Sequence, residues 1–173
     1  MTRFLIVPEA SRCWIDARSS LHPIHSETTG LQGWIEIAMR RGRKVDLTAA
    51  TGGHLELAVK RLRAGNPLEE RELKRRIDAR RFPTIDGDLT TISGTGVGGR
   101  YTVEGDLTFR GVTRRHRDEM TIRFEGDHTL RMTGQSTFDV RDFGMEPPRI
   151  GMLRVEPEVT VRIEIVAEAE ATD

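Results

Sequence analysis

The residues best suited to chemistry are five histidines, none of which stands in a recognised catalytic or metal-binding motif. His22 and His25, with Glu27, offer two imidazoles and a carboxylate within one short segment, LHPIHSE. A zinc site needs three or four ligands that converge in space and are oriented by a second layer of residues. The other histidines have no partner at ligand spacing in the sequence: His54, His116 and His128. We expect no metal site and interpret the histidines as surface residues.

Catalytic motifs are also missing from the sequence. It contains no Gly-x-Ser-x-Gly, no phosphate-binding glycine loop and no His-Glu-x-x-His. An enzyme built on this chain would have to draw on the charged group Asp139, Arg141 and Asp142, or on the segment with His22 and His25. Without a motif to support it, this stays an alternative, and we expect no catalytic residue and no cofactor.

The segment FRGVTRRHR, residues 109–117, has the arginine content of a nucleic-acid-binding arm. Arg115 and Arg117 are followed at once by Asp118 and Glu119, and the whole chain balances 27 Lys and Arg against 27 Asp and Glu. A single-strand binder would need a sustained basic stripe and exposed aromatic residues for stacking. We therefore predict a solvated turn between two strands and no nucleic-acid partner.

Length and composition predict one domain spanning residues 1–173. The apolar run Phe4–Val7 is too short for a signal sequence or a bilayer span. Cys13 is the single cysteine and cannot form an internal disulfide. We expect a cytoplasmic protein that is not an integral membrane protein.

The dominant pattern is alternation of apolar and polar residues with a period of two, which predicts half-buried strands. It recurs in the segments RCWIDARSS, WIEIAM, HLELAV, RYTVEGDLTF, EMTIRF, TLRMTGQSTF and EVTVRIEIVAEAE. Gly- or Pro-containing breaks separate these runs. Short strands with turns at this spacing indicate an antiparallel sandwich or barrel.

Residues 66 to about 81 interrupt this pattern and predict a helix. Asn66 can cap it, Pro67 suits its first turn, and Glu69 stands at the third position of a capping box. Acidic residues come early and basic residues late, which matches the helix dipole. The narrow apolar stripe, with Leu73 and Ile77, predicts that the helix lies on the sheet with its charged side in water.

The segment GDLTFRGVTR resembles a signature of the YceI-like family, G-x-Leu-Thr-(apolar)-x-Gly-Val-Thr-Lys. FLIVPEASRCWI is similar to the opening of that family, although Val7 and Ala10 stand where Asp and His are usual. ELKRRIDARRFPTI resembles its helix, and STFDVRDFGM its Arg-x-Asp-Phe-Gly segment. The resemblance runs from about residue 4 to about residue 168.

This resemblance implies an all-β fold, a lipocalin-like barrel of eight antiparallel strands capped by the helix. It also implies a hydrophobic interior that holds a polyisoprenoid or another long apolar lipid, and a possible homodimer. On this basis we expect a non-enzymatic binder, store or carrier of such a lipid. The alternatives are an enzyme with an apolar-substrate pocket and an interaction module with a filled core.

Alternation also predicts which side chains face inward. Small residues and unbranched methionines would suit a cavity for an aliphatic chain, although the same residues can form an ordinary packed core. The predicted pocket consists of Cys13, Ile15, Ala17, Ile35, Ile37, Met39, Leu57, Leu107, Met120, Ile122 and Met132.

Overall fold

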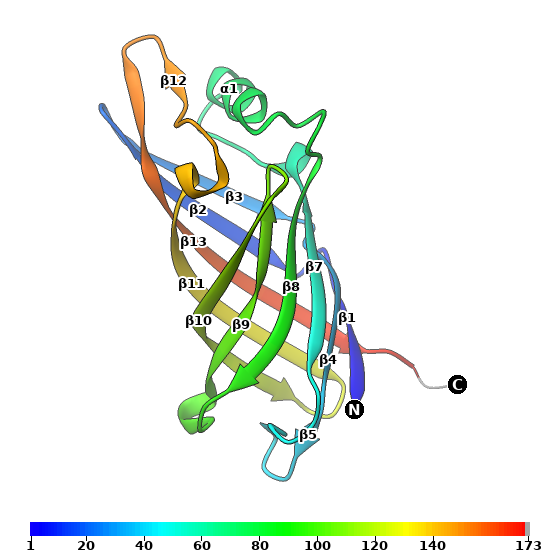
Figure 1. Cartoon of the computed structure of the whole chain (residues 1–173). Helices are drawn as coiled ribbons and strands as arrows, with labels where there is room; N and C mark the ends of the chain where they lie inside the picture. The colour runs from blue at the N-terminus through cyan, green and yellow to red at the C-terminus, as the bar shows by residue number, and fades with distance from the viewer. Residues whose placement is uncertain (172–173) are drawn as a thin grey trace.

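The computed structural model of the chain describes residues 1–171 and consists of antiparallel strands with one α-helix (Figure 1). Residues 172 and 173, the end of the predicted domain, lie outside the described part. The strands are β1 (Thr2–Ile6), β2 (Arg12–Ser19), β3 (Pro23–Thr29), β4 (Gln32–Ile37), β5 (Met39–Arg40), β6 (Lys44–Val45), β7 (Gly52–Ala58), β8 (Thr84–Ser93), β9 (Arg100–Phe109), β10 (Val112–Glu125), β11 (Thr129–Asp139), β12 (Arg149–Ile150) and β13 (Leu153–Ala169). The helix α1 spans Pro67–Ile77, and short 3-10 turns are η1 (Val59–Arg61), η2 (Val97–Gly99) and η3 (Val140–Phe143).

Eight strands close into a barrel, as the sequence predicts. Their order is β1-β4-β7-β8-β9-β10-β11-β13, and β1 completes the ring by pairing with β13 from Phe4↔Ala169 to Ile6↔Ala167. The hairpin β2–β3 continues the sheet from the same edge of β13, beyond the short β1. Because β13 is 17 residues long, it can pair with β1 near its end and with β2 before that.

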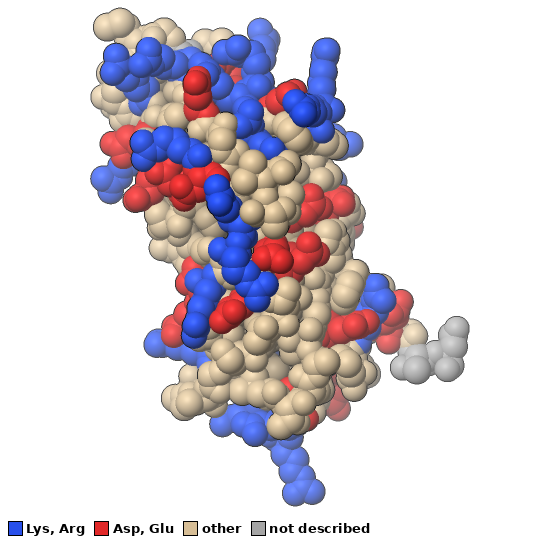
Figure 2. All heavy atoms as spheres, in the orientation of Figure 1, with Lys and Arg blue, Asp and Glu red and all other residues tan. Residues whose placement is uncertain are grey.

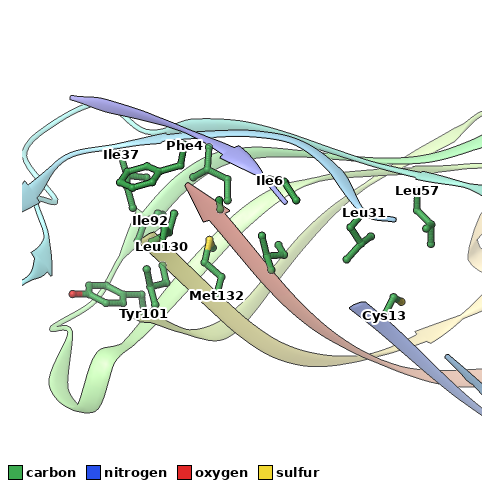
Figure 3. Packing of buried hydrophobic residues seen from close by; sticks show 14 of the residues in the cluster. Phe4, Ile6, Cys13, Leu31, Ile37, Leu57, Ile92, Tyr101, Leu130 and Met132 are labelled. Carbon is green, nitrogen blue, oxygen red and sulfur yellow. The ribbon is translucent and has the colours of Figure 1, made fainter. Parts of the chain in front are cut away.

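Large apolar side chains fill one half of the barrel (Figure 3). Phe4, Ile37 and Leu130 are each at most 2% exposed, and the Phe4 and Phe124 rings lie 6.0 Å apart. The hydroxyl of the buried Tyr101 accepts a hydrogen bond from the backbone N–H of Val45, at 3.1 Å. This half of the interior is an ordinary close-packed core.

The helix lies over the opposite end of the barrel (Figure 1). Asn66 caps it by accepting a hydrogen bond from Glu69 N–H at 2.9 Å, and the Glu69 carboxylate accepts one from Gly65 N–H at 3.1 Å. The sequence-based prediction of the capped start is confirmed. The helix ends at Ile77 rather than near residue 81 because Asp78 takes a left-handed conformation, with φ of 60°.

The polar side of α1 carries a cluster of ion pairs. Glu72 accepts hydrogen bonds from Arg75 and Arg76, and Arg76 also reaches Glu146 at 3.0 Å. Hydrogen bonding from Arg75, followed by that from Arg76, lowers the pKa of Glu72 from 4.5 to about 2. Of these contacts, the one between Arg76 and Glu146 links the helix to the loop before β12.

Met39, predicted to face the pocket, is 39% exposed. The strand β4 ends at Ile37, and the chain then turns into the separate hairpin β5–β6, so the alternation of WIEIAM no longer describes one face of the barrel. Met152, another of the methionines considered for the cavity, is 93% exposed in the turn between β12 and β13. No helix within residues 1–171 is long and apolar enough to cross a membrane.

Candidate functional site: a cavity under the helix

The half of the barrel beneath α1 encloses a cavity of about 420 Å³ with an almost entirely apolar surface. Pockets of 300–1,000 Å³ are typical of small-molecule binding sites. Eight members of the predicted pocket line this cavity: Cys13, Ile15, Ala17, Ile35, Leu57, Leu107, Met120 and Met132. Ile37 and Ile122 point inward but belong to the filled core, and Met39 lies outside. Alternation therefore identified the inward face correctly at ten of the eleven positions, without showing how far along the barrel each one lies.

Several lining residues were not predicted because they come from outside the strands. Leu73 and Ile77 of α1 close the cavity from above, and Phe143 contributes from η3. Met145, one of the methionines that were expected to suit the cavity, lines it from the loop after η3. The sequence predicted the apolar stripe with Leu73 and Ile77, but it did not show that this stripe faces a cavity. Val159 and Val161 of β13 also line the cavity and follow the same alternation as the predicted residues.

Glycines leave part of this space open. Gly87 of β8 faces inward between Leu55 and Leu107, and within 4 Å a Cβ at this position would meet only the Cβ of Leu55, at 3.9 Å. At Gly105 of β9 the situation is different, because a Cβ would lie 2.4 Å from the carbonyl oxygen of Asp88. Gly87 thus creates cavity volume, whereas Gly105 permits close approach of two strands.

Cys13 lies in the cavity wall and is 5% exposed. Burial raises the pKa of its thiol to about 11. The thiolate is the reactive form of cysteine. The side chain therefore acts as a small apolar residue of the lining.

The wall of the cavity is interrupted between β10 and β11, at a place that we call the side gap: residues 112–119 of β10 opposite residues 135–139 of β11. Backbone pairing of these strands ends at Met120 and Gly134. Beyond that point β10 still pairs with β9 as far as Val112, and β11 with β13 as far as Asp139. Figure 1 shows β10 and β11 separating toward the end covered by α1.

Two arginines from the β9–β10 hairpin close the far end of the side gap. Arg114 donates to the carbonyl oxygen of Asp142 at 3.0 Å, and Arg110 donates to that of Gly144. The RDFG segment thereby contributes backbone acceptors. The side chain of Asp142 itself is exposed.

Three polar side chains bridge the side gap. Asp118 and Ser136 face the cavity opposite each other, and the Ser136 hydroxyl donates to the Asp118 carboxylate. His116 Nε2 lies 3.0 Å from Ser136 Oγ, and the imidazole ring lies 4.7 Å from that of Phe138. The strands therefore keep their register through side chains where backbone pairing has stopped.

These residue types match a serine-hydrolase triad, but their arrangement does not. In a triad, histidine accepts the serine proton through one ring nitrogen while a carboxylate holds the other. Here the Ser136 hydroxyl is directed to Asp118, so Nε2 of His116 is the donor to Ser136. The same nitrogen lies 3.4 Å from Asp118. This arrangement therefore differs from the Ser-His-Asp geometry of a hydrolase.

The residues considered for an enzyme alternative lie outside the cavity lining. Arg141 is 64% exposed and pairs with Asp139, with Nη2 2.6 Å from Oδ2. Hydrogen bonding from Arg141 lowers the pKa of Asp139. His25 pairs with Asp16 on the exposed side of β2 and β3, and His22 Nε2 lies 3.8 Å from Glu69. These groups have structural contacts and do not converge on the apolar space.

One group on the outer face has the composition of a metal site. His54, Glu56 and Asp86 have potential ligand atoms within 4.8 Å of one another. Asp88 lies 2.8 Å from Nδ1 of His54, and Gln32 donates to Glu56 at 2.9 Å. The sequence did not reveal this group because its members come from β7 and β8, which are separated by the helix.

The arginine-rich segment is part of a mixed-charge surface. Arg115 lies 3.6 Å from Glu104 and 3.5 Å from Asp106, and Arg117 lies 3.5 Å from Glu104. Figure 2 shows basic and acidic residues interleaved on the face it presents. The acidic partners of these arginines come from the neighbouring strand β9, whereas the sequence had pointed to Asp118 and Glu119 in the same segment.

Known proteins share this fold at low sequence identity. BcnA of Burkholderia cenocepacia superimposes with a TM-score of 0.74 and 16% identity, covering 96% of this chain and 99% of BcnA. A polyisoprenoid binding domain from Saccharophagus degradans, implicated in plant cell wall breakdown, gives 0.74 and 10%, covering 98% and 100%. The YCEI protein of Campylobacter jejuni gives 0.63 and 11%, covering 84% and 85%. Comparison with curated protein sequences finds no match. The sequence model for the YceI-like domain matches residues 6–167.

Proposed function

The chain belongs to the YceI-like domain family, and from this premise we propose that it binds a long apolar lipid, a polyisoprenoid or similar, inside the barrel. The observation that carries the proposal is the apolar cavity of about 420 Å³ beneath α1. A packed interaction module would not retain such a space, since protein interiors are normally close-packed. The Saccharophagus degradans relative, described as a polyisoprenoid binding domain, supports the same ligand class.

Burial of apolar surface would supply the affinity. Each methylene group transferred from water to the cavity contributes about 0.8 kcal/mol. Met120, Met132 and Met145 line the cavity, and their unbranched side chains can adapt to ligands of different branching. A lining of this kind favours a class of apolar chains over one defined molecule.

We propose binding without chemical conversion. The thiol of Cys13 in the lining has a raised pKa, and the Ser136 hydroxyl is directed to Asp118 rather than to His116. A binder should return its ligand unchanged, whereas an enzyme should show turnover. We further propose a cytoplasmic location, which cell fractionation tests, and a homodimer, which sedimentation tests.

Uptake by delipidated protein tests the proposed function. The protein is unfolded in denaturant, extracted with organic solvent, refolded and incubated with tritiated geranylgeraniol. Gel filtration should show radioactivity co-eluting with the protein at no more than one ligand per chain, and the recovered ligand should be unmodified. Absence of co-elution would refute binding, and a modified product would favour the enzyme alternative.

A further inference from the structure

The cavity has a polar position where its wall is interrupted. Asp118, Ser136 and His116 lie at the side gap, and all three line the otherwise apolar space. The side chains of His116 and Asp118 are each 35% exposed, so they remain partly accessible. A ligand whose chain lies in the cavity can therefore place one end at this cluster.

The side gap also brings the cavity close to the outer surface. Glu119, Met120, Gly134 and Gln135 line both the cavity and a second, shallower pocket on the outside of the barrel. At Gly134 a Cβ would lie 2.9 Å from Cγ of Met120, so the two strands meet closely where pairing stops. The polar end of a ligand at this point can remain in contact with water while its chain is buried.

The cluster can accept a further hydrogen bond, but it has no free hydroxyl hydrogen to donate. The only hydroxyl hydrogen, that of Ser136, is donated to Asp118, and His116 Nε2 donates to Ser136. Asp118 accepts from Ser136 and from Glu119 N–H, at 2.8 Å for the latter. A carboxylate has about four acceptor sites, so Asp118 can accept a further bond. A ligand that donates a hydrogen bond satisfies this position.

Charge further restricts the ligand. Asp118 is a carboxylate at the cavity wall, and Arg63 is the one arginine among the described residues that line the cavity. Arg63 is already paired with Glu70 at 2.9 Å, and Arg110 and Arg114 donate to backbone carbonyl oxygens at the far end of the side gap. A phosphate or carboxylate within hydrogen-bonding distance of Asp118 would meet like charge in partly desolvated surroundings, which is costly.

We propose that the Asp118–Ser136–His116 cluster binds the head group of the lipid and selects a neutral hydroxyl over an anionic head group. This inference rests on the proposed function, because it names the ligand class for the same cavity. The hydroxyl donates to Asp118 and stays near the side gap, while the apolar chain extends toward the filled core. The ligand class is a long apolar chain with a hydroxyl group at one end, such as a polyprenyl alcohol.

A set of probes with the same chain tests the proposal. Delipidated protein loaded with tritiated geranylgeraniol is titrated with unlabelled geranylgeraniol, its methyl ether and geranylgeranyl phosphate, and displacement is measured. We expect the alcohol to compete about tenfold or more better than either the ether, which cannot donate, or the phosphate, which is anionic. Equal competition by all three probes would overturn the proposal and leave the proposed function standing. Failure of the wild type to bind any probe would refute both.

Two variants locate the selectivity at the cluster. Asp118→Asn removes the charge with little change of shape and should reduce the preference for alcohol over phosphate to about threefold or less. Glu125→Gln removes the same charge from the other end of the same strand, where the side chain pairs with Arg131 at 2.8 Å and lies away from the cavity, and should leave the preference unchanged. Equal effects of the two changes would overturn the assignment. The competition among the three probes uses only the wild-type protein. It therefore tests the preference for the alcohol even if Asp118→Asn folds poorly.

Discussion

Gly87 offers a direct way to fill the cavity with protein. It lies within β8, lines the cavity, and has room for a side chain because a Cβ would meet only Leu55 Cβ within 4 Å, at 3.9 Å. The change Gly87→Leu therefore directs four extra carbon atoms into the apolar space. In a hollow barrel this side chain occupies ligand volume, whereas in a filled core it would collide with its neighbours.

The two situations predict opposite changes in stability. Glycine within a strand is less favourable than alanine by roughly 0.5–1 kcal/mol, so delipidated Gly87→Leu should be as stable as the wild type or more stable by about that amount. Overpacking of a filled core would instead destabilise by about 1–3 kcal/mol. Displacing four methylene-sized groups of the ligand at about 0.8 kcal/mol each removes ~3 kcal/mol of binding free energy, or about 100-fold in Kd.

Urea unfolding of delipidated proteins and titration with geranylgeraniol measure these two quantities. Gly105→Ala is the matched control, because its Cβ would lie 2.4 Å from the Asp88 carbonyl oxygen and should destabilise the protein. If Gly87→Leu lowered the free energy of unfolding by about 1–3 kcal/mol, as overpacking does, the barrel would not be hollow. A stable variant that binds as tightly as the wild type would refute the cavity as the ligand site.

Other changes test the helix and the charged surface. Asn66→Ala removes the cap of α1 and should lower the free energy of unfolding by about 1 kcal/mol in urea, and an unchanged midpoint would contradict the cap. The pKa of Glu72 is lowered to about 2 in the folded protein, so its contribution to stability should be fully present above pH 4.5 and be lost as the pH falls toward 2. Glu72→Gln should therefore reduce the fall of the melting temperature at acid pH. A dependence of the melting temperature on pH identical to that of the wild type would argue against this. Arg115→Ser with Arg117→Ser should leave the fold intact and change no specific nucleic-acid binding, and salt-sensitive binding lost in the double variant would contradict a purely structural role.

Local chemistry allowed much of the fold to be predicted. The alternation of Cys13, Ile15 and Ala17 places them on the inner face because successive side chains of a strand point to opposite sides. The cap at Asn66 was also readable, since its partner Glu69 lies three residues away. Closure of the strands into a barrel came from the family resemblance, because alternation alone is equally compatible with a sandwich.

The features that were not predicted depend on contacts between distant segments. Ile15 and Ile37 have the same place in an alternating pattern, yet one lines the cavity and the other is in the core, because depth along the barrel is set by register with other strands. Asp118 and Ser136 stand opposite each other in the register that Met120 and Gly134 set, yet backbone pairing of β10 and β11 ends just before them. Neither strand contains a signal for this separation, so the side gap was invisible in the sequence.

Native mass spectrometry of the protein as purified from its own cells tests the central claim most directly. The account predicts a population whose mass exceeds that of the chain by one non-covalently bound molecule, which solvent extraction releases as an intact, neutral, long-chain apolar lipid. A spectrum with only the mass of the chain and no extractable lipid, combined with no uptake of geranylgeraniol by the delipidated protein, would contradict it.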